Sequence, residues 1–284
     1  MTKISKSFSS NWHDYELIDA GGGRKLERFG SVTIIRPEVQ AYFRSGLLFD
    51  EWDKIADWQF IPGKGQSGKW KQLNPKAPRK WTLKYESFTF QLELTKFKHI
   101  GIFPEQRLNW DLIRSHVNEK SSCLNLFAYT GAMSCVSKGQ GADTLHVDSV
   151  KQLISWAAIN MELSNLINIK WVHEDALKFI NRLVKRDSKF DAIIMDPPAW
   201  GIGAKNEKWK LEDKLEELIF ASKKILSDKG ILVLNTYSPK VNSSMIQRLA
   251  EKHFSKREFI VDELWMNTNT NKELYFGIRL IIGA

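Results

Sequence analysis

Polar residues follow four short apolar stretches of the chain, and this pattern is the first indication of chemistry. Short apolar runs bounded by turn residues are typical of buried strands. In an open, doubly wound sheet the ligand crevice lies outside the carboxyl ends of the strands, so we expect these four ends to meet around one ligand. The stretches and the residues that follow them are 123–128 with Tyr129-Thr130-Gly131, 144–147 with Asp148, 169–172 with Glu174-Asp175, and 190–195 with Asp196-Pro197-Pro198.

The acids after the second and third stretches have positions that suit a nucleoside. Asp148 follows Gly131 by 17 residues, at a strand end where an acidic side chain typically accepts hydrogen bonds from both ribose hydroxyls. The pair Glu174-Asp175 could accept a hydrogen bond from an adenine amino group. Both acids also have an interpretation as helix caps, because Asp is a preferred residue at helix starts.

The first and fourth strand ends narrow the kind of ligand. Small residues follow Gly131, so a ligand can approach the backbone and the positive end of a helix. A single glycine serves a dinucleotide pyrophosphate poorly, which argues against an NAD-dependent oxidoreductase on the same fold plan. The two prolines after Asp196 cannot continue a strand ladder, so carbonyl groups and the Asp196 carboxylate are expected to face the crevice.

The elements that position these groups alternate in type. Alternating strands and helices predict an α/β fold with a doubly wound, mostly parallel, seven-stranded Rossmann-like sheet. The last two strands have no helix between them, so they are expected to pair as a hairpin at the sheet edge. The expected strands are 123–128, 144–147, 169–172, 190–195, 231–235, 258–264 and 274–282, and the expected helices are 108–117, 132–140, 150–163, 176–185, 211–226 and 241–253.

Residues 1–98 differ in composition and patterning from the rest of the chain, which predicts two domains. Residues 1–98 are expected to form a small β-rich or mixed domain that could contact RNA or another substrate, and residues 99–284 the larger α/β domain. Residues 81–85 and 88–92 alternate apolar and polar side chains, which predicts a hairpin of half-buried strands. Gly21-Gly22-Gly23 lacks the spacing of a phosphate-binding loop and predicts a turn.

Composition excludes several classes of protein. Of the 284 residues, 43% are hydrophobic, which is enough for a sizeable core. There is no apolar run of transmembrane length and no apolar core of a signal peptide, so the expected location is the cytoplasm, with no membrane association. Cys123 and Cys135 lie in apolar stretches and are expected to be buried, reduced thiols, and the stretches poor in His and Cys predict no metal site.

The distribution of charge favours a polyanionic partner such as RNA. The net charge is +9, and seven cations but no acid lie between Asp57 and Glu86. Cations of this kind can contact phosphates, and the interleaved Trp70 and Trp81 could offer rings to unstacked bases, although packing of both tryptophans onto the domain is an equal alternative. The seven cations are Lys64, Lys69, Lys71, Lys76, Arg79, Lys80 and Lys84.

Taken together, the strand-end motifs resemble those of the class I S-adenosylmethionine-dependent methyltransferases. More narrowly, they look like the bacterial 23S ribosomal RNA large-subunit methyltransferases, which share an N-L-F-x-Y-T-G turn and a D-P-P-x-F loop. The segment Gly101 to Arg107 is similar to that group's G-x-F-x-D-Q-R segment, so the resemblance covers residues 98–284. The motifs that carry it are Asn125 to Gly131, His146-Val147-Asp148, Glu174-Asp175-Ala176 and Phe190 to Pro198.

The resemblance implies S-adenosylmethionine as the cofactor and gives roles to particular residues. Asp148 would hold the ribose, Asp175 the adenine, and Asp196 would face the methyl group and the target base. Phe103 and Gln106 would close over the cofactor. The residues that would line its methionine end are Asn125, Phe127, Tyr129 and Gly131.

Departures from the family pattern favour a nitrogen as the methyl acceptor. The cytosine-C5 members use a cysteine in a T-F-S-C-S segment, and here that segment reads Asn235 to Lys240 without a cysteine. A base nitrogen needs only an acceptor to orient or deprotonate it, which Asp196 or the Pro197 carbonyl could provide. Trp200 stands where the group has Phe, and could either stack on a flipped base or serve packing.

These features predict methyl transfer to a base nitrogen in ribosomal RNA, with RNA contacted through Lys64, Lys69, Lys71 and Lys80. The N-terminal region does not match the PUA-type RNA-binding domain of many relatives. Alternatives are therefore a methyltransferase acting on a protein or small molecule, or a noncatalytic RNA-binding protein. The intact Asp148, Asp175 and Asp196 argue against the last of these.

Overall fold

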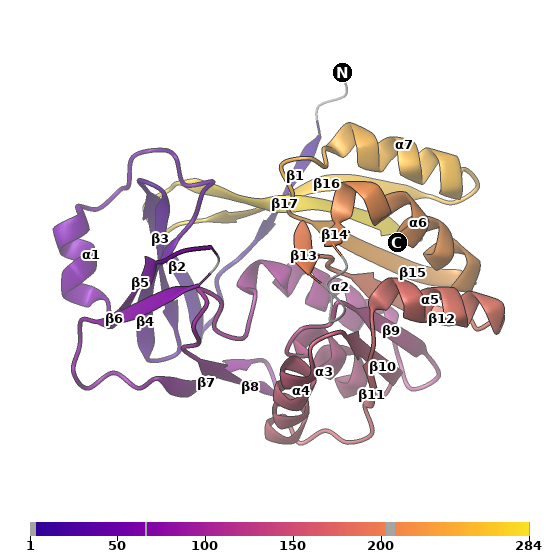
Figure 1. Cartoon of the computed structure of the whole chain (residues 1–284), viewed down its shortest axis with the longest axis horizontal. Helices are drawn as coiled ribbons and strands as arrows, with labels where there is room; N and C mark the ends of the chain where they lie inside the picture. The colour runs from indigo at the N-terminus through magenta and orange to yellow at the C-terminus, as the bar shows by residue number, and fades with distance from the viewer. Residues whose placement is uncertain (1–3, 66, 203–207, 284) are drawn as a thin grey trace. The chain divides into compact units, whose positions relative to one another are not determined.

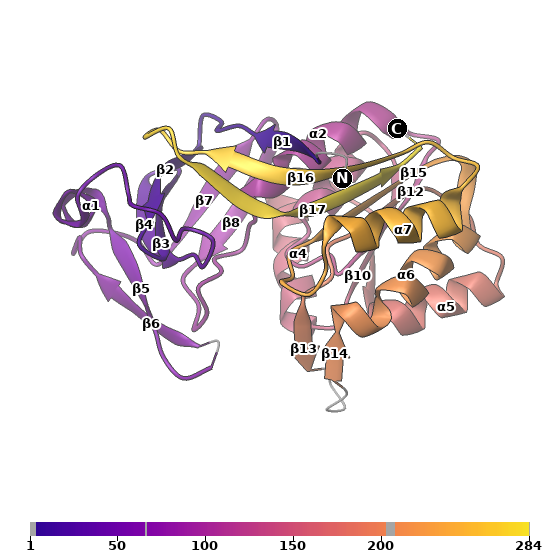
Figure 2. The same ribbon diagram turned by 90° about the horizontal axis from the view of Figure 1, so that it is seen from above.

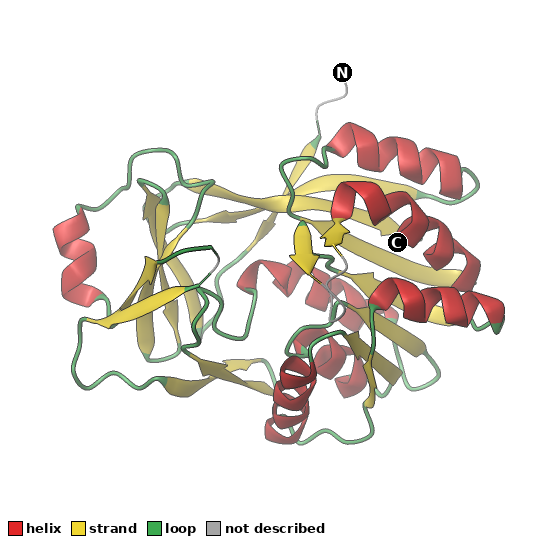
Figure 3. Ribbon diagram, viewed as in Figure 1, coloured by secondary structure: helices red, strands yellow, loops and turns green. Residues whose placement is uncertain are grey.

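A computed structural model describes residues 4–65, 67–202 and 208–283, and the chain forms two compact units (Figures 1 and 3). The first unit comprises Met1–Ser7, Leu108–Leu264 and Phe276–Ala284, and the second comprises Phe8–Arg107 and Trp265–Tyr275. Their limits differ from the expected division at residue 98, because a segment near the carboxyl end of the chain belongs to the second unit.

An eight-stranded sheet organises the first unit, in the order β1-β16-β17-β15-β12-β9-β10-β11. Strands β9, β10, β11, β12 and β15 are parallel, and β17 runs antiparallel to β15. The bounds are β1 Ser5–Ser9, β9 Ser122–Leu126, β10 Asp143–Asp148, β11 Lys170–His173, β12 Phe190–Met195, β15 Leu226–Thr236, β16 Phe259–Asn267 and β17 Glu273–Ile282.

Helices cover both faces of this sheet, so it is doubly wound. Helices α5, α6 and α7 lie side by side (Figures 1 and 2), while α3 packs against α4 and both contact β10. The helix bounds are α2 Arg107–His116, α3 Ala132–Gly139, α4 Lys151–Leu163, α5 Ala176–Lys185, α6 Leu211–Ile225 and α7 Ser243–Phe254. No helix in the described ranges is both long and apolar enough to cross a membrane.

The α/β fold with a mostly parallel sheet is confirmed, and all seven expected strands are present. Strand β1 adds an eighth member beside β16, which the sequence did not predict because the two strands lie at opposite ends of the chain. A second addition is a two-stranded sheet after β12, formed by β13 (Trp200–Ile202) and β14 (Lys208–Lys210). Cys123 and Cys135 are buried free thiols, and burial raises the pKa of each to about 12.

The second unit contains a five-stranded sheet in the order β2-β3-β4-β5-β6, one helix and the expected hairpin β7-β8. Trp52 from the helix packs with Leu26 and Ile35 of the sheet, which gives this unit its own core. The bounds are β2 Tyr15–Gly21, β3 Arg24–Phe29, β4 Val32–Pro37, α1 Phe49–Ile55, β5 Trp58–Pro62, β6 Gly68–Gln72, β7 Lys80–Tyr85, β8 Phe88–Glu93 and the 3₁₀ turn η1 Pro104–Gln106.

Asp19 is a fully buried carboxylate that gathers several donors within the second unit. It accepts hydrogen bonds from the Trp52 indole at 3.0 Å, from the Leu47 amide at 2.7 Å and from the Gly46 amide at 3.1 Å. The hydroxyl of Thr270 also donates to it. Thr270 lies between β16 and β17, so one buried acid fixes segments from both ends of the chain.

A buried ion pair in the first unit ties β16 to β17. Arg279 donates from Nε to Asp262 Oδ1 at 3.0 Å and from Nη2 to Oδ2 at 2.6 Å, and its Nη1 donates to Asn109 Oδ1 at 3.3 Å. Asp262 is 2% and Arg279 is 7% exposed. Because both charges are removed from water, loss of one would leave the other without compensation.

We expect Asp262→Ala to lower the free energy of unfolding by about 3–5 kcal/mol, because Arg279 is then buried without its carboxylate. Lys170→Ala is the matched control, since its pair with Asp143 is 2.6 Å long but exposed, and it should cost less than about 1 kcal/mol. Urea denaturation measures both values. Equal losses of unfolding free energy in the two variants would show that the buried pair of Asp262 and Arg279 contributes no more to stability than the exposed pair.

Candidate functional site

The turn between β9 and α3 has an unusual backbone. Phe127 and Tyr129 have φ angles of 55° and 52°, and Gly131 has a φ of 82°. The left-handed region disfavours residues with a Cβ atom, so the two aromatic positions must be held by contacts from other elements. These contacts come from β10 and α4.

Gly131 and Asn160 fix the turn against α4. A Cβ atom at Gly131 would lie 2.8 Å from the Cβ of Ala157, so this close approach of the turn to α4 requires glycine. Asn160 is fully buried and donates from Nδ2 to the Thr130 carbonyl at 2.8 Å. Sequence inspection missed Ala157 and Asn160, because a small residue and an amide within a helix carry no local signal of such a role.

Asp148, at the end of β10, accepts hydrogen bonds from backbone amides in two turns. Its Oδ2 accepts from the Tyr129 amide and its Oδ1 from the Val150 amide, each at 2.9 Å. The first bond holds the turn after β9, and the second holds the start of α4. Burial raises the pKa of this carboxyl group, while the backbone N–H groups act in the opposite direction.

A buried polar chain lies below the turn. Asn125 donates from Nδ2 to Ser134 Oγ at 2.9 Å, and Ser134 Oγ lies 3.0 Å from Nδ1 of His146. His146 is fully buried, and burial lowers its pKa to about 3, so the imidazole is neutral. Asn125 thus contacts α3 through Ser134, a contact that spacing along the sequence cannot reveal.

The acids after β11 have local partners. Asp175 is the N-cap of α5 and accepts from the Lys178 amide at 2.9 Å, in agreement with its interpretation as a helix cap. Glu174 pairs with Arg182 of α5. The cap uses one carboxylate oxygen of Asp175 and leaves further acceptor capacity on the group.

Asp196, directly after β12, lies next to the end of β15. Asn235 donates from Nδ2 to Asp196 Oδ1 at 3.3 Å. Asn235 is 3% exposed, and within the described part of the chain its Oδ1 atom has no hydrogen-bond partner. Asn235 was not singled out from the sequence, although it carries the same signal as Asp196, a polar residue that closes a buried strand.

The segment after Asp196 carries two tryptophans with different surroundings. Pro197 is buried, Pro198 is exposed, and Trp200 on β13 is 47% exposed. Trp209 on β14 donates from Nε1 to the Pro198 carbonyl at 2.6 Å, and its ring centroid lies 5.1 Å from that of Phe127. Trp209 therefore joins the segment after β12 to the turn after β9, which brings two of the predicted strand ends together.

Phe103 and Gln106 belong to the second unit. The Phe103 ring lies 5.1 Å from the ring of His99, and Gln106 is buried in the turn η1. Burial lowers the pKa of His99 to about 3, so this imidazole is also neutral. Their expected role over the cofactor stays a prediction.

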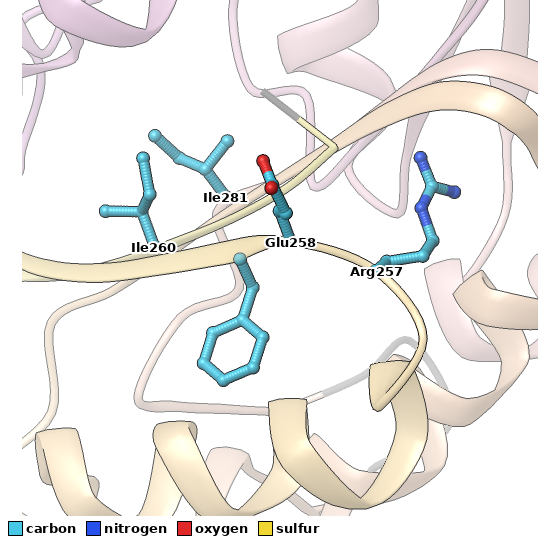
Figure 4. Close-up of a pocket in the computed structure, with 5 residues that line it drawn as sticks. Arg257, Glu258, Ile260 and Ile281 are labelled. Atoms are coloured by element: carbon cyan, nitrogen blue, oxygen red, sulfur yellow. The ribbon is translucent and has the colours of Figure 1, made fainter.

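A surface pocket elsewhere in the first unit is distinct from this cluster. Arg257, Glu258, Phe259, Ile260 and Ile281 line it (Figure 4). Arg257 donates to the Ser227 carbonyl at 3.2 Å, near the amino end of β15. Asp148, Asp196 and Asn235 lie at the carboxyl ends of their strands, so the pocket does not include them.

The doubly wound sheet with its strand-end turn, Asp148 and Asp196-Pro197-Pro198 defines a class I S-adenosylmethionine-dependent methyltransferase. A crystal structure of a SAM-dependent methyltransferase from Agrobacterium tumefaciens matches 99% of this chain and 93% of its own, with 33% identity and a TM-score of 0.91. Residues 107–260 match the family described as Conserved hypothetical protein 95. The chain belongs to this family.

Curated relatives are similar over part of their length. The protein named ribosomal RNA large subunit methyltransferase K/L from Pseudoalteromonas translucida is 28% identical over 207 residues, which is 71% of this chain and 26% of the relative. The protein of the same name from Buchnera aphidicola is 31% identical over 149 residues, 51% of this chain and 21% of the relative. The chain thus spans about a quarter of the curated relatives it matches.

The buried His146 predicts a pH dependence of stability. Because its folded pKa is about 3 and its ordinary value is 6.5, only the unfolded chain binds this proton between those values. Stability is therefore lost as the pH falls from about 6.5 towards 3, with a slope of about 1.4 kcal/mol per pH unit from this group. His146→Gln should remove that part of the slope.

Urea denaturation of both proteins at several pH values between 4 and 8 measures the effect. At pH 8 neither protein carries the charge, so the difference there isolates the effect of removing the bond to Ser134. An unchanged slope in His146→Gln would show that His146 does not titrate as its burial requires.

Proposed function

We propose that this protein transfers a methyl group from S-adenosylmethionine to a nitrogen of a base in ribosomal RNA. The observation that carries the proposal is the Asp196-Pro197-Pro198 segment at the end of β12, joined to the turn after β9 through Trp209. The similarity to the SAM-dependent methyltransferase from A. tumefaciens supports the cofactor, and the names of the K/L relatives support the substrate.

The residues at the first two strand ends fit the cofactor. Gly131 has no side chain to cap α3, so the first amides of this helix can meet a carboxylate, such as that of the methionine part. Asp148 uses one acceptor position on each oxygen for the backbone, and its remaining lone pairs can accept the ribose hydroxyls. The bound cofactor supplies an electrophilic methyl group on a sulfonium sulfur.

Further cofactor contacts are assigned by the family pattern. Phe127 and Tyr129 line the methionine end from the turn, and Asn125 supports that end through Ser134. Asp175 accepts from the adenine amino group. The same pattern assigns Phe103 and Gln106 to the cofactor.

The protein's part in the reaction is to orient the acceptor nitrogen and to take its proton. The nitrogen lone pair forms the new N–C bond, the C–S bond breaks with its electron pair moving to sulfur, and the nitrogen proton passes to an acceptor. Asp196, oriented by Asn235, takes this proton, and the Pro197 carbonyl accepts a hydrogen bond that orients the nitrogen. Trp200 is exposed and offers a ring on which the base stacks.

Covalent activation of a pyrimidine is not available to this site. That route requires a thiolate nucleophile, whereas Cys123 and Cys135 are buried and their pKa values are about 12. A nitrogen acceptor needs no such nucleophile. The chemistry of the described residues therefore favours N-methylation over C5-methylation.

Exposed lysines of the second unit provide the contact with RNA phosphates. Lys69 and Lys71 on β6, with Lys64 and Lys80 nearby in sequence, are exposed, and no ion pair involves them in the parts of the chain that the structure describes. Trp81 is buried with its indole bonded to the Phe29 carbonyl at 2.9 Å, and Trp70 donates to the Thr95 carbonyl at 2.8 Å. The two tryptophans pack within the unit, so the proposed contact is electrostatic.

Replacement of Asp196 tests the catalytic proposal. Asp196→Ala should lower kcat for methyl transfer by about 10²–10⁴-fold, because the acceptor for the nitrogen proton is lost. Asp196→Asn keeps the size and removes the charge. Cofactor affinity should stay within about tenfold, or 1.4 kcal/mol, in both variants. Wild-type turnover in Asp196→Ala would remove this residue from the mechanism.

The assay is transfer of labelled methyl groups to RNA from cells that lack the gene, followed by nucleoside chromatography. Label in a base methylated on nitrogen supports the proposal, and label in C5-methylcytidine overturns it. Binding of the cofactor without label in RNA would redirect the search to a protein or small-molecule substrate.

Charge reversal tests the RNA surface. The triple variant Lys69→Glu, Lys71→Glu, Lys80→Glu should weaken RNA binding and reduce the slope of log K against log salt by about 0.7–0.9 for each phosphate that is no longer neutralised. The matched control reverses the exposed Lys185, Lys223 and Lys229, which changes the net charge equally. Filter binding at several salt concentrations measures both. An identical change of slope in the two triple variants would mean that only net charge matters, and it would contradict the proposed RNA contact.

A further inference from the structure

Trp209 of the first unit contacts both halves of the proposed site. It lies on β14, where it pairs with Gly201 of β13, while Trp200 pairs with Lys210. Cross-strand partners share a face of the sheet and neighbours alternate, so Trp200 and Trp209 point to opposite faces. Trp200 and Lys210 are exposed, whereas Trp209 is half-buried.

The hydrogen bond from Trp209 holds a backbone segment that contains two prolines. Pro197 and Pro198 have no N–H group, so neither residue can hold this segment by donating a backbone hydrogen bond. The Trp209 indole supplies a donor from another strand, 2.6 Å from the Pro198 carbonyl. The Leu211 amide adds a second bond, to the Ala199 carbonyl at 3.1 Å, so the segment between Asp196 and Trp200 is held from β14 and the start of α6.

The other side of the same indole contacts the turn that the cofactor approaches. Its ring lies 5.1 Å from the Phe127 ring at an interplanar angle of 55°, a favourable tilted arrangement of aromatic rings. Phe127 has a left-handed backbone, a conformation that has to be held by contacts such as this one. A movement of either ring therefore affects the other.

We propose that Trp209 is a positioning residue that couples the cofactor turn to the base-binding segment. Its ring contacts Phe127 on the cofactor side, and its N–H group fixes the Pro198 carbonyl and thereby the segment between Asp196 and Trp200 for the base. The two contacts belong to one rigid indole, so occupancy of the cofactor site stabilises the geometry that receives the base. This role rests on the proposed function of the site.

Three variants separate the two contacts. Trp209→Phe keeps an aromatic ring near Phe127 and removes the N–H donor, and Trp209→Ala removes both contacts. Phe127→Leu removes the ring contact and leaves the indole N–H donor in place. Trp58→Phe is the matched control, because the Trp58 indole also donates to a proline carbonyl, that of Pro78 at 3.1 Å, in the second unit. This control should leave methyl transfer unchanged.

The expected result is a division of effects between kcat and cofactor affinity. Trp209→Phe should lower kcat about fivefold, as expected when one hydrogen bond is removed, with the KM for S-adenosylmethionine within about twofold of wild type. Trp209→Ala should in addition weaken S-adenosylhomocysteine binding about fivefold, with unchanged stoichiometry in calorimetry. The stoichiometry distinguishes positioning from partial unfolding, which would lower the number of sites.

A double-mutant cycle between Phe127→Leu and Trp209→Ala measures the coupling directly. The effects on S-adenosylhomocysteine binding should be less than additive in the double variant, because both changes remove the same interaction. Full additivity, or wild-type kcat in Trp209→Phe, would overturn the inference. If the wild-type protein methylates no RNA, the proposed function fails, while the cycle still decides whether Trp209 braces the cofactor turn.

Discussion

The carboxylate of Asp148 joins two turns at the carboxyl ends of β9 and β10. One of these turns contains two non-glycine residues in the left-handed region, a conformation that costs about 1–2 kcal/mol per residue. The bond to the Tyr129 amide, the bond from Asn160 to the Thr130 carbonyl and the contact of Gly131 with Ala157 offset this cost. The shape of the turn after β9 is therefore set by β10 and α4, and it depends on their position.

The parallel sheet brings the other parts of the site to the same edge. Strand β12 lies between β9 and β15, so the segment after β12 has the turn after β9 on one side and Asn235 on the other. Each strand end contributes a different chemical group, and the central strands are buried over almost their whole length. The apolar strands thus act as a rigid support for a small number of polar groups.

The sequence was sufficient for the α/β alternation, since each of the seven expected strands and six expected helices has a local signal in its apolar pattern. The sequence also singled out Asp148 and Asp196, each of which lies at or directly after the end of a buried strand, and Asp175, which caps α5 after β11. Their roles at the cofactor and the base stay predictions. The sequence did not identify Trp209, because that role depends on how β13 and β14 pair. The chain Asn125, Ser134 and His146 depends likewise on the packing of α3 against β10, and β1 has a partner at the far end of the chain.

The hydrogen bond from Thr270 to Asp19 limits when the second unit can complete its structure during synthesis of the chain. The ribosome synthesises Asp19 early. The Asp19 carboxylate cannot accept the hydrogen bond from the Thr270 hydroxyl until more than 250 further residues have been made. The second unit is therefore incomplete while the nascent chain grows, although most of its residues precede those of the first. Its last strands arrive only after the parallel sheet has been translated, so the amino-terminal segment acquires its final structure among the last parts of the molecule.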